Sequence, residues 1–269
     1  IRQVKHCFRL TLEYDGSPYS GWQEQANART VMGDLRQAVE SHIKTRAEIT
    51  GAGRTDAGVH AAGQVAHLKF EAPRRPDAAL LAAEINRRTP HNIAVLECAP
   101  APLSFHARRD ATARVYTYQI ATRKLAFSKP YVWWIKEPLD LGAMQAGCAQ
   151  IAGRHDFGCF RAEDPSKPGE STLVEVASAS LTRDEDLILF RIEASHFLWR
   201  MVRRLTGVLV KLGLGEITAR DFARLLSARP HPKLDAAAWT APAAGLFLTE
   251  VKYPPGALTG PPRNRSPRP

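Results

Sequence analysis

The segment from Gly51 to His60 places one carboxylate and one guanidinium in a stretch with few bulky side chains. Asp56 and Arg54 carry these charges, and three of the ten residues are glycines. Because glycine has no Cβ, a substrate or another backbone can approach such a loop closely. The segment therefore predicts either a catalytic loop or a tight hairpin in which Asp56 forms the turn and Arg54 is solvated.

The full string at 53–61, Gly-Arg-Thr-Asp-Ala-Gly-Val-His-Ala, resembles the signature of the tRNA pseudouridine synthase A family, and a strand-like pattern follows it at once. A near-match of this length with ordered companions is far more specific than a lone short motif. The resemblance runs from about residue 6 to 253, and its other blocks are Tyr14-Asp15-Gly16 with Tyr19 and Gly21-Trp22-Gln23, Phe105-His106-Ala107-Arg108, Ala113-Arg114-Val115-Tyr116-Thr117-Tyr118, and Met201-Val202-Arg203 before Gly207.

The resemblance implies an isomerase that converts uridine to pseudouridine in the anticodon stem-loop of tRNA, at tRNA positions 38 to 40. This reaction breaks the N1–C1′ bond, rotates the uracil and joins C5 to the same sugar carbon. It needs a reactive carboxylate, a partner that keeps the carboxylate ionised, and a surface that holds the loosened base. It needs no cofactor. The family also implies a homodimer in which one subunit binds the tRNA body while the other catalyses.

By this resemblance Asp56 is the catalytic carboxylate, acting as a nucleophile toward the sugar or the base, or removing a ribose proton. Burial against a base would raise the pKa of Asp56, and a nearby guanidinium would oppose that shift. Arg54 and Arg203 are the two candidates. The resemblance pairs Arg203 with Asp56 and links Arg54 to intercalation beside the target base, whereas Arg203 on its own would be interpreted as a solvated helix arginine.

Two tyrosines lie two residues apart in a predicted strand, so Tyr116 and Tyr118 point to one face with Arg114. A tyrosine ring can stack on uracil, and its hydroxyl can form a hydrogen bond or relay a proton. The resemblance assigns Tyr116 to the active site, and we expect Tyr118 in the core. Leu246 matches a pocket-wall position of the family and would fit equally well in the core.

Hydrophobic periodicity predicts an α+β fold in which the order β-α-β-β-α-β occurs twice. The first set is strand 6–14, helix 31–44, strands 47–50 and 64–70, helix 77–88 and strand 93–99. The second is strand 113–121, helix 140–152, strands 172–182 and 187–194, helix 197–213 and strand 246–253, with an extra helix capped by Thr218 and Asp221.

This pattern predicts two ferredoxin-like halves, 1–103 with the Asp56 loop and 104–253. We expect the halves to join into one large, mostly antiparallel sheet with helices on one face and a basic cleft between them. The Pro-rich, basic segment 254–269 offers little to bury and is expected to be a disordered tail.

The net charge of +10 over 269 residues fits a polyanionic partner such as tRNA. Paired arginines follow a phosphate backbone better than dispersed charge. Any one of these side chains alone would more often be ordinary solvated surface. The candidates for RNA contact are Arg29, Arg36, Arg74, Arg75, Arg87, Arg88, Arg108 and Arg109.

Several other classes are disfavoured. Cys7, Cys98, Cys148 and Cys159 form no C-x-x-C pair, and the spacing of His60 and His67 is not that of a ligand pair, so no disulfide framework or metal site is expected. No apolar run is long enough to span a bilayer, so the chain is expected to be cytoplasmic.

Two alternative functions remain at this stage. One is a non-catalytic tandem RNA-binding protein, although no strand carries the aromatic signature of RNA-recognition motifs. The other is a hydrolase built on Asp56, which would require a second carboxylate nearby. The sequence also departs from the family pattern at Trp199-Arg200, where a bulky ring and an extra cation precede Met201. This departure could change which RNA is preferred.

Overall fold

The computed structural model describes residues 2–163, 169–229 and 231–257. Within these ranges the protein is a mixed α+β structure with ten strands, most of them paired antiparallel, and five α-helices. This confirms the predicted fold class. The chain divides into two compact units, one of Ile1–Thr112 with Leu248–Pro269 and the other of Ala113–Phe247. The predicted tail 254–269 lies outside the described residues from 258 onward.

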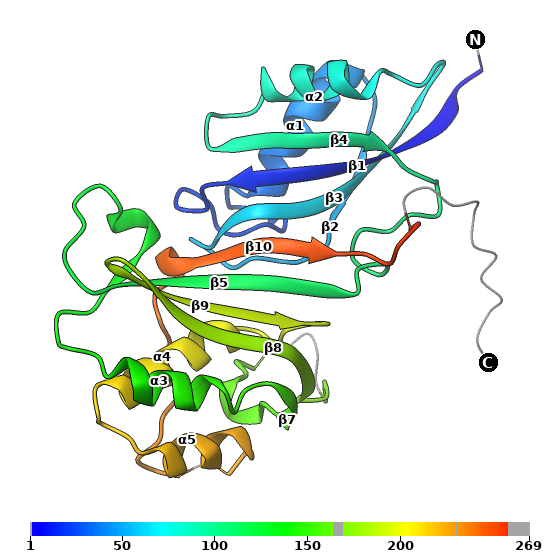
Figure 1. Cartoon of the computed structure of the whole chain (residues 1–269). Helices are drawn as coiled ribbons and strands as arrows, with labels where there is room; N and C mark the ends of the chain where they lie inside the picture. Colours follow the sequence, from blue (N-terminus) through cyan, green and yellow to red (C-terminus); the bar gives the residue numbers. More distant parts are fainter. Residues whose placement is uncertain (1, 164–168, 230, 258–269) are drawn as a thin grey trace, which may run out of the picture. The chain divides into compact units, whose positions relative to one another are not determined.

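The first unit has the predicted order β-α-β-β-α-β (Figure 1). Its strands follow the order β4-β1-β3-β10, and β2 also pairs with β3. The unit therefore extends past the expected boundary at 103 and also includes a strand from the end of the chain. Its elements are β1 (Val4–Tyr14), α1 (Val31–Ile43), β2 (Glu48–Gly51), β3 (His60–Ala72), α2 (Ala78–Asn86), β4 (Ile93–Pro100) and, from Leu248 on, β10 (Leu246–Lys252).

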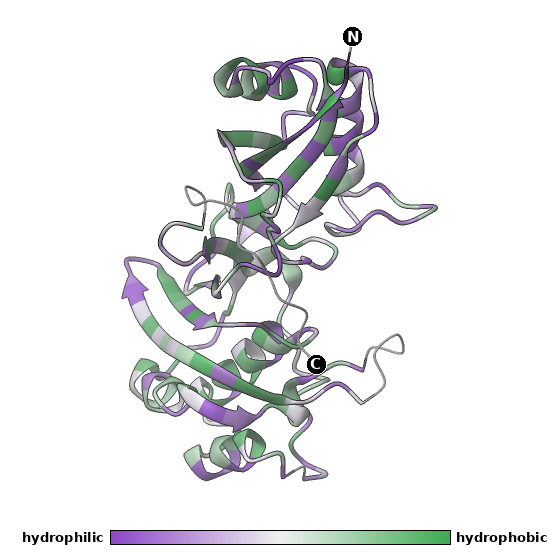
Figure 2. Ribbon diagram, turned by 90° about the vertical axis from the view of Figure 1, so that its right-hand side faces the viewer, coloured by the Kyte–Doolittle hydropathy of each residue, from purple (hydrophilic) through white to green (hydrophobic). Residues whose placement is uncertain are grey.

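The central strand β1 alternates in the way its sequence predicts. Phe8, Leu10 and Leu12 are fully buried, and β1 pairs antiparallel with β3 on one side and β4 on the other. Figure 2 shows the same alternation of polar and apolar residues along the strands. The helix α1 starts where Thr30 Oγ1 accepts a hydrogen bond from the Gly33 N–H at 3.2 Å, which satisfies one of the unpaired N–H groups of its first turn.

The second unit contains a sheet in the order β5-β9-β8-β7, with the short β6 parallel to β5. The strands β6 and β7 were not predicted, because segments this short carry no readable alternation. The elements are β5 (Ala113–Ala121), β6 (Trp133–Trp134), α3 (Leu141–Cys148), β7 (Gly153–Asp156), β8 (Leu173–Asp184), β9 (Leu187–Ala194), α4 (Met201–Gly213) and α5 (Ala219–Leu226).

The helix predicted over 197–213 is shorter than expected, since α4 begins at Met201. Arg200 adopts a left-handed conformation with φ of 60°, which a right-handed helix cannot continue. The Met201 N–H instead closes a turn onto the Leu198 carbonyl at 3.1 Å. Trp199 and Arg200 therefore lie in a turn ahead of the helix. The capping box expected at Thr218 is confirmed at the start of α5.

Among the residues described, no helix combines the length and apolar character required to cross a bilayer.

Candidate active site

The Asp56 loop, residues 52–59, connects β2 to β3 in the first unit. Its side chains differ sharply in burial: Arg54 is exposed, Thr55 is buried and Asp56 is half-buried. Thr55 is the main anchor, because its hydroxyl lies 2.8 Å from the Tyr14 hydroxyl and its carbonyl accepts a hydrogen bond from the Trp22 N–H at 3.1 Å. The residue beside Asp56 is therefore held through both its side chain and its backbone.

A buried amide on β3 holds the first part of the same loop. Gln64 is fully buried, and its Nε2 donates to the Gly53 carbonyl at 2.8 Å while its Oε1 accepts from the Gly53 N–H at 3.3 Å. Both backbone polar groups of Gly53 are thus satisfied by one side chain. Leaving either group buried and unpaired would cost about 1–3 kcal/mol.

The block Tyr14 to Gln23, which the sequence matched only by resemblance, packs directly beneath this loop. Gly21 has φ of +101°, and a Cβ on it would lie 2.7 Å from the Thr55 carbonyl oxygen. A Cβ on Gly16 would lie 1.9 Å from the Val59 carbonyl oxygen. Glycine is therefore required at both positions for the two segments to approach each other. The block supports the loop and holds its conformation.

The two interpretations of the loop prove compatible. The Val59 N–H donates to the Asp56 carbonyl at 3.1 Å, so Asp56 does lie in a turn. The turn differs from an ordinary solvated hairpin, because buried Tyr14, Trp22 and Gln64 fix it from below. Such a loop can hold a half-buried carboxylate in one position before a substrate arrives.

His60 begins β3 and is almost fully buried. Its Nδ1 accepts a hydrogen bond from the Gly16 N–H at 3.0 Å and lies 3.1 Å from Asp15 Oδ1. These contacts tie the Tyr14–Gln23 block to the end of the Asp56 loop, which is a supporting role. No cluster of three or more His, Cys, Asp or Glu side chains suited to a metal ion occurs among the described residues.

In the second unit, Tyr118 is a core residue, as expected. It is fully buried, its hydroxyl donates to the Pro242 carbonyl at 2.7 Å, and burial raises its pKa. Tyr116 lies two residues earlier on β5, and its ring packs edge-on against Phe197 with centroids 5.1 Å apart. The two tyrosines on the same strand therefore have different surroundings.

The resemblance to the tRNA pseudouridine synthase A family predicts that Tyr116→Phe slows turnover while tRNA affinity is retained, because the ring can still stack but the hydroxyl is lost. We expect Tyr118→Phe to act on stability, at about 1 kcal/mol, because the Pro242 carbonyl loses its buried donor. Steady-state kinetics and thermal melts on both variants check this. The reverse pattern would mean that the two side chains have the opposite roles.

Arg203 on α4 is not the solvated helix arginine that its sequence position alone predicts. It is half-buried, and its Nε donates to the Ala241 carbonyl at 2.7 Å. The Ala241 N–H in turn donates to the Arg203 carbonyl at 3.0 Å. The segment around Ala241 thus covers this side of the helix and fixes the plane of the guanidinium. Sequence periodicity could not show this, because the covering segment is distant along the chain.

The same segment leads into Leu246, the first residue of β10. Tyr118 holds it through Pro242, and Arg203 holds it through Ala241. Tyr116, Arg203 and Leu246 all belong to the second unit, whereas Arg54 and Asp56 belong to the first.

Comparison with known proteins identifies the family. The family model for tRNA pseudouridine synthase matches residues 11–110 and 148–254. The chain belongs to the tRNA pseudouridine synthase family. It is 40% identical to the tRNA pseudouridine synthase A of Xanthobacter autotrophicus over 91% of this chain and 99% of that protein. The corresponding proteins of Bartonella bacilliformis and Maricaulis maris are 38% and 39% identical, over 91% and 92% of this chain and 99% and 98% of theirs.

This synthase is therefore an isomerase that modifies tRNA, which confirms the resemblance found in the sequence. The alternatives of a non-catalytic RNA-binding protein and of a hydrolase are set aside. The matched residues include the whole Asp56 loop and its supporting Tyr14–Gln23 block, as well as Arg203 and Leu246.

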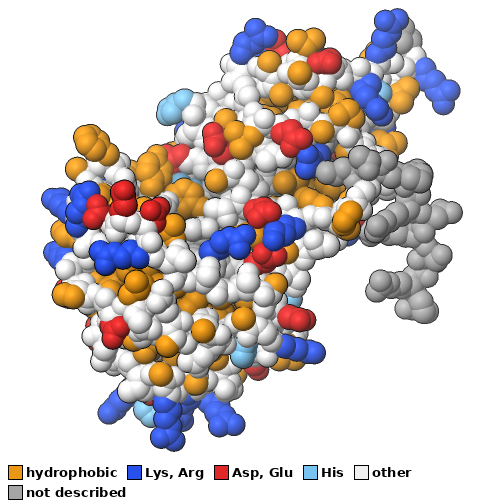
Figure 3. All heavy atoms as spheres, in the orientation of Figure 1, with side chains coloured by type: hydrophobic (Ala, Val, Ile, Leu, Met, Phe, Trp, Pro, Cys, Tyr) orange, Lys and Arg blue, Asp and Glu red, His pale blue; other side chains and the backbone are white. Residues whose placement is uncertain are grey.

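The arginines predicted to contact RNA fall into three groups in the synthase. The first group already faces carboxylates: Arg29 Nη2 lies 2.8 Å from Asp34 Oδ2, and both Arg87 and Arg88 contact the Glu84 carboxylate. Arg36 likewise pairs with Glu24 at 2.9 Å. Figure 3 shows several basic side chains beside acidic ones on the face in view.

Arg74 and Arg75 form the second group. Both are exposed in the connection between β3 and α2, and neither guanidinium has a hydrogen-bond or ion-pair partner in the part of the chain that the structure describes. Charges without an internal partner are more available to phosphate than charges that already face a carboxylate.

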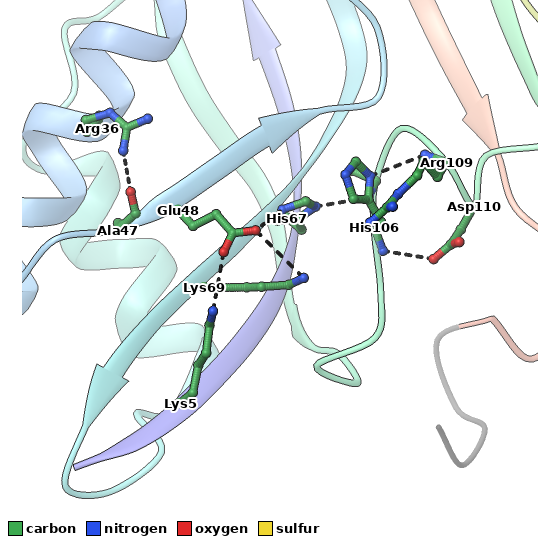
Figure 4. Close-up of polar contacts among 10 residues, drawn as sticks. Lys5, Arg36, Ala47, Glu48, His67, Lys69, His106, Arg109 and Asp110 are labelled. Atoms are coloured by element: carbon green, nitrogen blue, oxygen red, sulfur yellow. Dashed lines mark hydrogen bonds and ion pairs between the residues drawn. The ribbon is translucent and has the colours of Figure 1, made fainter. Parts of the chain in front are cut away.

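Arg108 and Arg109 form the third group, next to each other in the loop 105–110, and both side chains are exposed. His67 on β3 lies beneath this loop (Figure 4), where its Nδ1 accepts from the Ala107 N–H at 3.1 Å and its Nε2 lies 3.2 Å from Glu48 Oε1. The pKa of His67 is lowered to about 4, mainly by burial and to a smaller extent by the Lys69 ammonium and His106, while the contact with Glu48 opposes the shift.

This shift predicts a stability that depends on pH. The unfolded chain takes up a proton on His67 near pH 6.5, but the folded protein does so only near pH 4, so protons favour the unfolded chain between these values. The contribution of His67 to the free energy of unfolding should be complete above pH 6.5 and fall by up to about 3 kcal/mol as the pH is lowered to 4.

Thermal melts of the wild type and of His67→Asn across this range check the prediction, because asparagine does not titrate and the groups that do not interact with His67 cancel in the difference. The neighbours that also carry charge here are Glu48, Lys69, His106 and Arg109. If the stability of the two proteins changed with pH in the same way, the predicted contribution of His67 would be contradicted.

Proposed function

We propose that this synthase isomerises uridines in the anticodon stem-loop of tRNA, at tRNA positions 38 to 40, with Asp56 as its catalytic residue. The observation that carries the proposal is the anchoring of the Asp56 loop by Thr55 and Gln64, because a preformed loop places a carboxylate without further ordering when tRNA binds. The resemblance to the family supports the choice of stem-loop.

The reaction requires that the bond between N1 and C1′ breaks and that a bond between C5 and C1′ forms. N1 gains a proton and C5 loses one, so the product is an isomer of the substrate and no oxidant, reductant or cofactor is consumed. Asp56 acts on the nucleoside either as a nucleophile or as the base that removes a ribose proton. The carboxylate must be ionised in either case.

Three residues of the second unit are also proposed to take part in the reaction. Arg203 keeps the Asp56 carboxylate ionised, a role for which a guanidinium with a fixed plane is suited. Tyr116 stacks on the uracil, and Leu246 forms the wall of its pocket. Arg54, which is exposed on the Asp56 loop, occupies the space that the target base leaves in the RNA.

We further propose that the synthase is a cytoplasmic homodimer. All four cysteines are free thiols, as expected for a reducing compartment. A dimer can bind the tRNA body through one subunit and the stem-loop through the other. Sedimentation of the purified protein should give twice the monomer mass.

The position of modification can be mapped directly. Transcripts of one tRNA that carry a single uridine among positions 38, 39 and 40 of the anticodon stem-loop are incubated with the protein, and a transcript with cytidine at all three positions is the control. We expect pseudouridine at the single test position in each case and none in the control. Pseudouridine elsewhere in the control transcript would contradict the proposed stem-loop.

The exposed pair Arg74 and Arg75 leads to a prediction for the salt dependence of tRNA binding. If the basic side chains contact on the order of five phosphates, log K for tRNA should fall with log[salt] at a slope of roughly −3.5 to −4.5. Replacing Arg74 and Arg75 with alanine should weaken binding and flatten the slope by about one to two units.

The double variant of Arg87 and Arg88 is the matched control, because it removes the same charge from a site where both guanidinium groups already contact the Glu84 carboxylate. The Arg87/Arg88 variant should change the slope of log K against log[salt] less than the Arg74/Arg75 variant does. Filter binding across a salt series measures both. An unchanged slope for the Arg74/Arg75 variant would place the tRNA on another surface.

A further inference from the structure

We propose that His67 is a positioning residue for tRNA binding, and that it acts by holding the loop 105–110 in the conformation that presents Arg108 and Arg109 to RNA phosphates. The inference rests on the proposed function, since it assumes that this loop contacts tRNA. His67 itself is fully buried and would touch no RNA.

The hydrogen bonds of His67 determine its tautomer. The Ala107 N–H can only donate, so His67 Nδ1 must be the acceptor and carry no proton. The ring proton therefore lies on Nε2 and is donated to Glu48 Oε1 at 3.2 Å. Lys5 and Lys69 approach the same carboxylate at 3.4 and 3.9 Å (Figure 4). Glu48 thus fixes which nitrogen of His67 faces the loop.

The peptide groups of Ala107 are held from two sides. Its N–H donates to His67, and its carbonyl accepts a hydrogen bond from the Tyr253 hydroxyl at 2.6 Å. The next peptide is also held, because the Arg109 N–H donates to His106 Nδ1 at 3.3 Å. The backbone on both sides of Arg108 is therefore fixed, while the side chains of Arg108 and Arg109 are exposed.

Histidine at position 67 supplies an acceptor for the Ala107 N–H that an apolar side chain could not supply. The loop contributes Phe105 and Ala107 to a core cluster with Cys7 and Val65, which an apolar side chain at position 67 would extend. A buried imidazole is costly unless its hydrogen bonds are made. Its two bonds connect an exposed carboxylate to one backbone N–H, next to two exposed arginines. This arrangement sets the direction in which the arginines leave the backbone.

Two isosteric substitutions separate the two bonds. In His67→Asn the amide oxygen takes the place of Nδ1, so the acceptor for Ala107 is kept and the contact with Glu48 is lost. In His67→Gln the amide nitrogen takes the place of Nε2, so the contact with Glu48 is kept and the Ala107 acceptor is lost. Both variants carry an uncharged amide, which makes each the control for the other.

The experiment measures the Kd of each variant for an unmodified tRNA transcript across a salt series, with circular dichroism to show that each protein is folded. We expect His67→Gln to weaken binding about tenfold and to flatten the salt slope by about one to two units, as the loss of one to two phosphate contacts requires. We expect His67→Asn to bind within about threefold of the wild type.

A third variant tests whether His67 acts through the arginines. Arg108→Ala with Arg109→Ala should lose as much affinity as His67→Gln, and adding His67→Gln to it should weaken binding no further. Three outcomes would overturn the proposal. The asparagine and glutamine variants could lose equal affinity, or neither could lose any. The loss of affinity in His67→Gln could also add to that of the arginine variant.

The proposed function and this inference can fail separately. Mapping of pseudouridine with the wild-type protein tests the stem-loop, whatever the variants do. The comparison of His67→Asn with His67→Gln uses tRNA binding alone, so it gives an answer even if the modified uridine lies elsewhere.

Discussion

Asp56→Asn should abolish isomerisation, with a loss of at least ~10³-fold in turnover, because the amide keeps the size of the carboxylate but neither its charge nor its nucleophilicity. Fold and tRNA affinity should change little. The loop is anchored through Thr55 and Gly53, and none of the hydrogen bonds that hold these two residues uses the Asp56 side chain. Tritium release from tRNA labelled at C5 of uridine measures the turnover.

The matched control is Asp77→Asn. Asp77 is an exposed aspartate of the same unit that caps α2 by accepting from the Leu80 N–H at 2.9 Å, and asparagine caps a helix equally well. This variant should keep full activity. If Asp56→Asn retained activity within tenfold of the wild type, Asp56 would be only a turn residue.

Arg203→Lys should lower kcat/KM on the order of 10²-fold, although it conserves the charge. Lysine lacks the planar group that grips a carboxylate through two nitrogens, and its flexible stem has no Nε to donate to the Ala241 carbonyl. The lost hydrogen bond should also lower the free energy of unfolding by about 1 kcal/mol. The loss of activity should be far larger than this change in stability explains.

Arg220→Lys is the control for this change, because Arg220 is an exposed arginine in the first turn of α5. We expect it to leave both activity and melting temperature unchanged. Normal turnover of tRNA by Arg203→Lys at a temperature where the variant is folded would show that Arg203 only stabilises the segment around Ala241.

The sequence was sufficient for the elements whose own periodicity or capping defines them. The strand β1 and the helix α1 appear where Phe8, Leu10 and Thr30 predict them. The predicted start of α4 was wrong, because the left-handed backbone conformation of Arg200 cannot be recognised from a hydrophobic pattern. The sequence of β10 predicted a strand but not its position in the sheet, because β3, its partner in the first unit, lies far away along the chain.

For the candidate site, sequence reasoning found the reactive groups but not what holds them. Asp56 and Arg54 were conspicuous because glycines surround them. Gln64 was missed, because a lone glutamine in a strand gives no sign that it binds both backbone polar groups of one loop residue. His67 was noticed only as a possible metal ligand. Its actual contacts, with Glu48 and the Ala107 backbone, depend on tertiary packing.

We propose that Asp56 and Arg203 act as one catalytic group. A double-mutant cycle on the single-turnover rate, with the protein in excess over a tRNA transcript, tests this most directly. If Arg203 acts through Asp56, then Asp56→Asn combined with Arg203→Lys should be no more than about threefold slower than Asp56→Asn alone, as residues that work as a unit are strongly non-additive. If instead the two losses multiply, Arg203 serves a separate purpose and the claim is wrong.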